Sequence, residues 1–72
     1  MKQYPIFLER EEDGGYSVYA PDLPGCVSQG ETREEATRNI QEAIVAWIET
    51  AIEAGYEVPA AGSSLDFVSI AS

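Results

Sequence analysis

The sequence contains no histidine, a single cysteine and only four basic side chains among its 72 residues. Without histidine it lacks the commonest general base and metal ligand, and one cysteine cannot form a disulfide within the chain. Four scattered cations do not make the basic patch that a nucleic-acid backbone requires. The longest apolar run is far too short to span a membrane, and the first five residues do not resemble a signal peptide. These absences disfavour nucleic-acid and membrane partners and predict a reducing, cytoplasmic location.

Negative charge is abundant: 13 acidic side chains against 4 basic ones give a formal net charge of -9. A field of that sign repels nucleic acid and steers a basic protein toward the chain, mainly by raising the association rate. The same excess of carboxylates also keeps a small protein soluble. Charge alone therefore leaves a basic partner and simple solubility equally open.

Three short β-favourable segments come first in the chain. Residues 3–11 and 16–20 flank the sequence Glu-Asp-Gly-Gly, whose glycines permit the tight reversal of a hairpin. A rigid connection with two prolines follows at residues 21–25, and residues 26–29 form the third predicted strand. A last strand is predicted at residues 65–70.

A long helix separates the third predicted strand from the last. Thr32 and Glu35 have the spacing of a capping box, apolar residues then recur every three or four positions, and Gly55 suits a left-handed cap. The helix should end at about Ala54, with four residues packed on the sheet: Ile40, Ile44, Trp47 and Ala51.

The resulting order is β-β-β-α-β, an α+β fold in a single domain of residues 1–72. A right-handed crossover would lay the last strand parallel to the first, giving one mixed sheet covered by one helix. Because one helix covers only one face of a sheet, we expect a homodimer or a higher homo-oligomer.

No catalytic, cofactor or metal site is expected. Cys26 has no histidine to activate it, so a small buried structural residue is favoured over a nucleophile. Asp22 could be one ligand of a metal pair, but in a Pro-Asp-Leu-Pro turn its side chain is expected to bond the backbone two residues on. The remaining acids near the hairpin indicate a solvated end: Glu9, Glu11, Glu12 and Asp13.

Two features of the predicted helix indicate a protein partner. Its acidic residues form a stripe opposite Ile40 and Trp47, although an ordinary solvent-facing stripe is the alternative. Its apolar arc is also wider than one packing seam requires, and self-association is the rival use of this flank. The predicted partner-binding residues are Glu42, Val45, Ile48, Glu49, Ile52 and Glu53.

The segment GYSVYAPDLPGCVSQG at residues 15–30, followed by ETREEA at 31–36 and NIQEAI at 39–44, resembles the HicB antitoxin family. The resemblance implies a partial ribonuclease H-like β-β-β-α-β fold that usually self-associates. It also implies neutralisation of HicA, a small basic toxin that cleaves messenger RNA.

Longer members of that family carry a C-terminal helix-turn-helix or ribbon-helix-helix domain, and this sequence shows no such DNA-binding domain after its last predicted strand. Three functions stay open. The favoured one is an antitoxin-like protein binder, and the second is a stand-alone oligomeric domain of unknown ligand. The third, a residual metal-dependent nuclease, is least favoured because the metal-binding acids of ribonuclease H cannot be placed.

Overall fold

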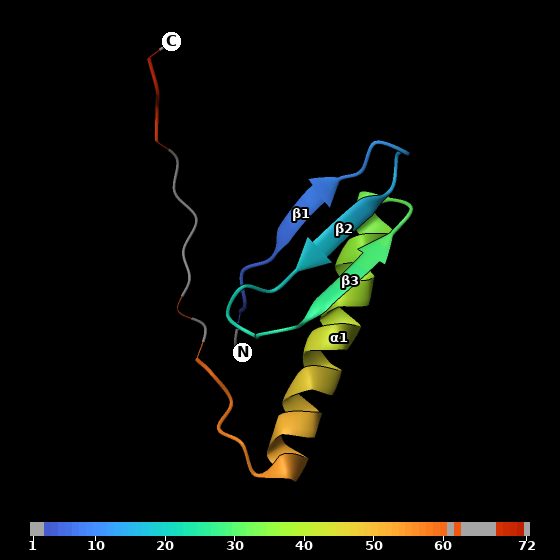
Figure 1. The fold of residues 1–72 in the computed structure, drawn as a ribbon. Coiled ribbons are helices and arrows are strands. Elements are labelled where there is room, and N and C mark those ends of the chain that lie inside the picture. The colour runs from blue at the N-terminus through green and yellow to red at the C-terminus, as the bar shows by residue number, and fades with distance from the viewer. Residues whose placement is uncertain (1–2, 61, 63–67, 72) are drawn as a thin grey trace.

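The computed structural model describes residues 3–60, 62 and 68–71 and contains a three-stranded sheet and one helix (Figure 1). The elements are β1 (Phe7–Arg10), β2 (Tyr16–Tyr19), β3 (Val27–Gly30) and α1 (Arg33–Ala54). The sheet is antiparallel in the order β1-β2-β3, and α1 lies against one face, behind β2 and β3 in Figure 1. The predicted α+β class and the order β-β-β-α are confirmed.

The register of the sheet separates a buried face from an exposed one. Leu8 of β1 pairs with Val18 of β2, and Val18, 2 % exposed, points toward α1. On the opposite face Phe7 pairs with Tyr19 and their rings stack with centroids 5.3 Å apart. Tyr19 in turn pairs with Val27 of β3, so an exposed apolar row crosses the outer face of the sheet.

The connection between β2 and β3 is held by backbone hydrogen bonds and buries a leucine. The Ala20 amide donates to the Cys26 carbonyl at 3.0 Å, and the Leu23 amide donates to Ala20 at 3.1 Å. This loop places Leu23 in the core with 1 % exposure. The indole Nε1 of Trp47 donates to the Pro24 carbonyl at 2.9 Å, which ties the loop to α1.

Both ends of α1 are capped by local sequence signals. The Thr32 hydroxyl accepts from the Glu35 amide at 3.1 Å, and the Glu35 carboxylate accepts from the Glu31 amide at 2.9 Å. At the other end Gly55 adopts φ +81°, and its amide donates to the Ile52 carbonyl at 3.1 Å. The predicted bounds of the helix are confirmed, because the residues that start it and the residue that ends it act on neighbouring backbone.

The helix packs on the sheet as its periodicity predicts. Ile40 is buried in the core, and Ile44 and Trp47 are half-buried at its rim. Ala51 is also buried, but it lies outside the core cluster on the sheet. A helix of 22 residues is about 33 Å long, but a strand of 4 residues spans only about 13 Å. The C-terminal half of α1 therefore projects beyond the sheet, as Figure 1 shows.

The last predicted strand, residues 65–70, lies partly outside the described residues. Its described end, residues 68–70, belongs to no strand. Within the described chain the sheet is therefore antiparallel and not mixed, because these residues run clear of β1 and find no backbone partner there (Figure 1). The ribonuclease H-like assignment stays a prediction.

Replacing Ile40 tests the packing of α1. Ile40→Ala removes a fully buried side chain and should lower the free energy of unfolding by about 2–5 kcal/mol. Val45→Ala, on the exposed side of the same helix, should change it by no more than about 0.5 kcal/mol. Urea unfolding followed by circular dichroism measures both, and equal effects would contradict this orientation of α1.

Replacing Gly30 tests the approach of α1 to β3. A Cβ at Gly30 would lie 2.5 Å from the Ala36 backbone nitrogen, where no flexible side chain can move aside. Gly30→Ala should therefore cost about 1–3 kcal/mol of stability. Gly62→Ala is the matched control, since its Cβ would meet only the Ala60 carbonyl oxygen at 3.9 Å. A Gly30→Ala chain as stable as this control would show that the helix does not sit so close.

Candidate protein-binding site

The predicted partner-binding residues lie on the exterior of α1. Val45 is 55 % exposed and Ile52 64 % exposed, whereas Ile48 between them is half-buried. The three acids of the set are all exposed. The structure gathers Glu42, Val45 and Glu49 around a shallow hollow of about 340 Å³. The other three predicted residues do not line that hollow.

Charge along this flank has one sign. The last turn of α1 carries no basic side chain to offset the negative end of the helix dipole. Glu53, in that last turn, therefore sits where the helix itself disfavours a carboxylate, and Glu49 lies one turn before it. An approaching cation would be attracted by both the side chains and the helix terminus, with apolar area from Val45 and Ile52 beside it.

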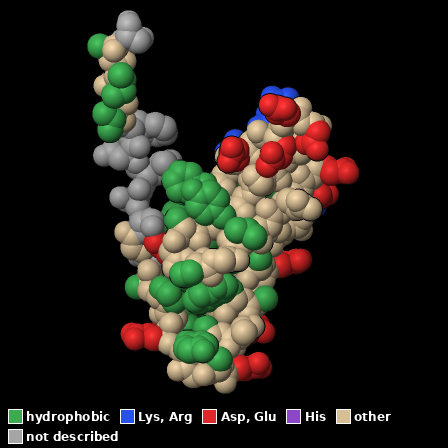
Figure 2. All heavy atoms as spheres, viewed as in Figure 1, with side chains coloured by type: hydrophobic (Ala, Val, Ile, Leu, Met, Phe, Trp, Pro, Cys, Tyr) green, Lys and Arg blue, Asp and Glu red, His purple; other side chains and the backbone are tan. Residues whose placement is uncertain are grey.

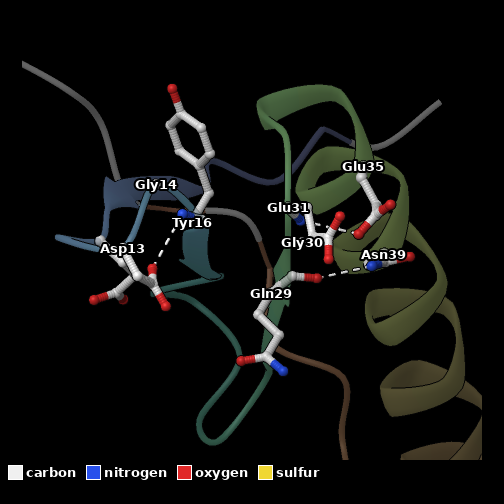
Figure 3. Close-up of a pocket in the computed structure, with 10 residues that line it drawn as sticks. Asp13, Gly14, Tyr16, Gln29, Gly30, Glu31, Glu35 and Asn39 are labelled. Atoms are coloured by element: carbon white, nitrogen blue, oxygen red, sulfur yellow. Dashed lines mark hydrogen bonds between the residues drawn. The ribbon is translucent and has the colours of Figure 1, made fainter.

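A second acidic region lies at the other end of the molecule (Figure 3). A hollow of about 650 Å³ separates the β1–β2 turn from the start of α1. Asp13 comes from the turn, whereas Glu31 and Glu35 come from the helix start, and Figure 2 shows acidic side chains gathered over this end. Two of these carboxylates also accept backbone hydrogen bonds: Asp13 from the Gly15 amide at 3.2 Å and Glu35 from the Glu31 amide at 2.9 Å.

Sequence reasoning treated the acids of the hairpin only as a solvated end and did not foresee this hollow. The order of the strands could have indicated it, because antiparallel connectivity puts the β1–β2 turn and the β3–α1 turn at the same end of the sheet. The hydrogen bond from the Asn39 side chain to the Gln29 carbonyl, at 2.7 Å, closes the hollow on the helix side.

An apolar groove of about 550 Å³ runs between the start of β3 and the C-terminal half of α1. Val27, Trp47 and Tyr56 line it, and Tyr56 is 73 % exposed. The groove exists because α1 overhangs the sheet, so that side chains near its end have no strand beneath them.

The two residues considered for chemistry have structural roles. Cys26 is 4 % exposed, and its burial raises the pKa of the thiol, so the thiol stays protonated and unreactive. One carboxylate oxygen of Asp22 accepts from the Gly62 amide at 2.9 Å. The expected bond to the backbone two residues on was wrong, because that residue is Pro24, which has no N–H.

In the described part of the chain, no three His, Cys, Asp or Glu side chains come together as a metal site. No helix among the described residues is long and apolar enough to cross a membrane.

Comparison with known proteins accounts for nearly the whole sequence. Residues 4–71 match the family model described as the HicB-like antitoxin of a bacterial toxin-antitoxin system. The chain belongs to the HicB-like antitoxin family. A UPF0150 protein of Synechocystis sp. is 52 % identical over 56 residues, which cover 78 % of this chain and 71 % of that protein. Antitoxin HicB 1 of Photorhabdus laumondii is 40 % identical over 60 residues, covering 83 % of this chain and 39 % of that antitoxin.

Solved structures of the HicB-like family have the same fold. The crystal structure of the N-terminal domain of Burkholderia pseudomallei antitoxin HicB superposes with a TM-score of 0.76 at 41 % identity, covering 85 % of this chain and 72 % of that one. The structure of the Burkholderia pseudomallei antitoxin HicB itself gives a TM-score of 0.78 at 41 % identity and covers 89 % of this chain, but only 47 % of that chain. This HicB-like chain thus aligns with the N-terminal domain of that antitoxin.

Burial of Cys26 predicts slow alkylation. At pH 8 iodoacetamide should modify the folded chain about tenfold more slowly than the urea-unfolded chain, because a raised pKa lowers the thiolate fraction and packing blocks access. The rate for the folded chain should also keep rising to a higher pH than the rate for the unfolded chain. Mass spectrometry of timed samples measures both rates, and equal rates would contradict a buried thiol.

Proposed function

We propose that this chain is an antitoxin that binds and neutralises a small basic toxin of the HicA type, which cleaves messenger RNA. The exposed flank of α1 carries the proposal, because it joins apolar area at Val45 and Ile52 to uncompensated negative charge at Glu49 and Glu53. Membership of the HicB-like antitoxin family supports the same class of partner. The site of action would be the cytoplasm, where messenger RNA is found.

The acids and the apolar side chains have different tasks in this proposal. The net charge of -9 attracts a basic toxin over distances limited by screening, about 8 Å at physiological ionic strength. Glu42, Glu49 and Glu53 therefore act mainly by raising the association rate. Val45, Ile48 and Ile52 hold the complex by burying apolar area, so they act mainly on dissociation.

We infer a binder and not an enzyme. The buried Cys26 thiol is not activated as a nucleophile, and an Asp22 carboxylate oxygen accepts from a backbone amide. The exposed row of Phe7, Tyr19 and Val27 favours a second candidate function, a stand-alone oligomer, since it is an apolar surface that α1 does not cover.

Charge reversal on α1 separates these alternatives. Binding of a HicA-type toxin encoded beside the chain is measured by surface plasmon resonance at low and physiological salt. A Glu42→Lys and Glu49→Lys double variant should lower the association rate about tenfold at low salt, with little change in dissociation. Val45→Ser with Ile52→Ser should instead raise the dissociation rate.

The matched control reverses two hairpin acids, Glu9→Lys and Glu12→Lys, which changes the net charge equally but away from α1. Its association rate should fall less than that of the α1 variant. No detectable toxin binding by the parent chain would remove the antitoxin proposal and leave the stand-alone oligomer. RNA cleavage by the purified chain alone, with magnesium, would revive the nuclease alternative.

A further inference from the structure

The apolar groove beside the C-terminal half of α1 is larger than the hollow on the outer flank of the helix. Its volume is about 550 Å³, against about 340 Å³ for the hollow, and none of the residues that line it is charged. Val27 of β3, Trp47 of α1 and Tyr56 from the chain after the helix contribute its large side chains. A groove of this size and character can take up an aromatic or aliphatic side chain of a partner.

Hydrogen bonds hold the sides of the groove in place. The indole Nε1 of Trp47 donates to the Pro24 carbonyl at 2.9 Å, and the Tyr56 amide donates to the Ala51 carbonyl at 2.8 Å. Tyr56 is nevertheless 73 % exposed, so its aromatic side chain contributes apolar area that the rest of the described chain leaves uncovered. A groove that is already formed costs a partner less ordering on binding.

The groove and the outer flank of α1 belong to one continuous surface. Ala46 lines both the groove and the hollow that Glu42 and Glu49 share. Glu49 follows Ala46 by three positions, which makes the two neighbours on the helix surface. Glu53 is related in the same way to Thr50, another residue of the groove. These three acids therefore form a ridge with apolar area on each side.

Figure 2 shows the same arrangement from one side of the molecule. Hydrophobic side chains gather over its lower part, and acidic side chains lie at the margins. The last turn of α1 carries no basic side chain that could neutralise the ridge from within the helix. The ridge is therefore free to attract cations of a partner.

We propose that a basic, amphipathic segment of the toxin lies across this ridge and inserts an aromatic or aliphatic side chain into the groove between β3 and α1. Charge complementarity selects this occupant, because lysine or arginine beside the inserted side chain would meet the acids of the ridge. A second copy of this chain, with a net charge of -9, would bring more acid to the same place. The inference rests on the proposed antitoxin function and adds to it the surface that retains the bound toxin.

The fluorescence of Trp47 gives the first test, because Trp47 is the only tryptophan of the chain and lines the groove. The probe is the HicA-type toxin encoded beside the chain, with any tryptophan of its own replaced by phenylalanine. Saturating toxin should lower the acrylamide quenching constant of Trp47 about twofold or more, since side chains at the core of an interface are shielded from solvent.

Surface plasmon resonance on the same pair keeps the two proposals apart. Toxin that binds without changing the quenching of Trp47 would overturn the insertion into the groove and leave the antitoxin function standing. Absence of toxin binding would instead overturn the antitoxin function, and the groove proposal with it.

Replacing Tyr56 gives the second test. Tyr56→Thr removes an aromatic side chain from the groove and should raise the dissociation rate of the toxin about tenfold, with little change in association. The matched control, Tyr19→Thr, removes the same side chain from the outer face of the sheet, outside the groove, and should leave dissociation unchanged. Urea unfolding checks that both variants are folded. A Tyr56→Thr chain that releases toxin at the parent rate, or no faster than the control, would overturn the proposal.

Discussion

The backbone of α1 meets the end of β3 so closely that glycine is required at the contact. A Cβ on Gly30 would come within 2.9 Å of the Ala36 Cα, and Ala36 itself is fully buried. Thr32 caps the helix between them, so the chain turns from strand to helix in a space that admits no larger side chain. This contact fixes the height and the rotation of α1 over the sheet, and Ile40 reaches the core one turn later.

The exposed flank of α1 is a consequence of that anchor. Because the helix is held at its first turn, all the length that exceeds the strands projects at the other end. Ala36, Ile40 and Ala51 face inward, so Val45 and Ile52, seven residues apart, must share an outward face. On the inner side, the hydrogen bond from Trp47 to the Pro24 carbonyl holds the projecting half of α1 to the β2–β3 loop. Any change that rotates the first turn would therefore also reorient the flank proposed to bind toxin.

Local signals in the sequence were enough to predict the hairpin and the helix, because Gly14, Thr32 and Gly55 each act on neighbouring backbone. Contacts between distant segments were not predictable in the same way. Leu23 looked like part of a rigid turn, yet it is 1 % exposed because α1 closes over the loop. The hollow lined by Asp13 and Glu31 forms because two turns lie close together at one end of the sheet. On α1 five of the six predicted residues are exposed and Ile48 is half-buried, and the sequence did not indicate which three of them share a hollow.

The net charge acts differently on the two kinds of association considered for this chain. Two copies that each carry -9 repel one another, so face-to-face docking of their acidic surfaces is unfavourable. Association between copies would therefore need an uncharged surface, such as the exposed row of Phe7, Tyr19 and Val27 on the sheet. A basic toxin, the proposed partner, would instead be attracted by the same charge. The acidic composition therefore favours a basic partner over a second copy wherever the contact includes the carboxylates of α1.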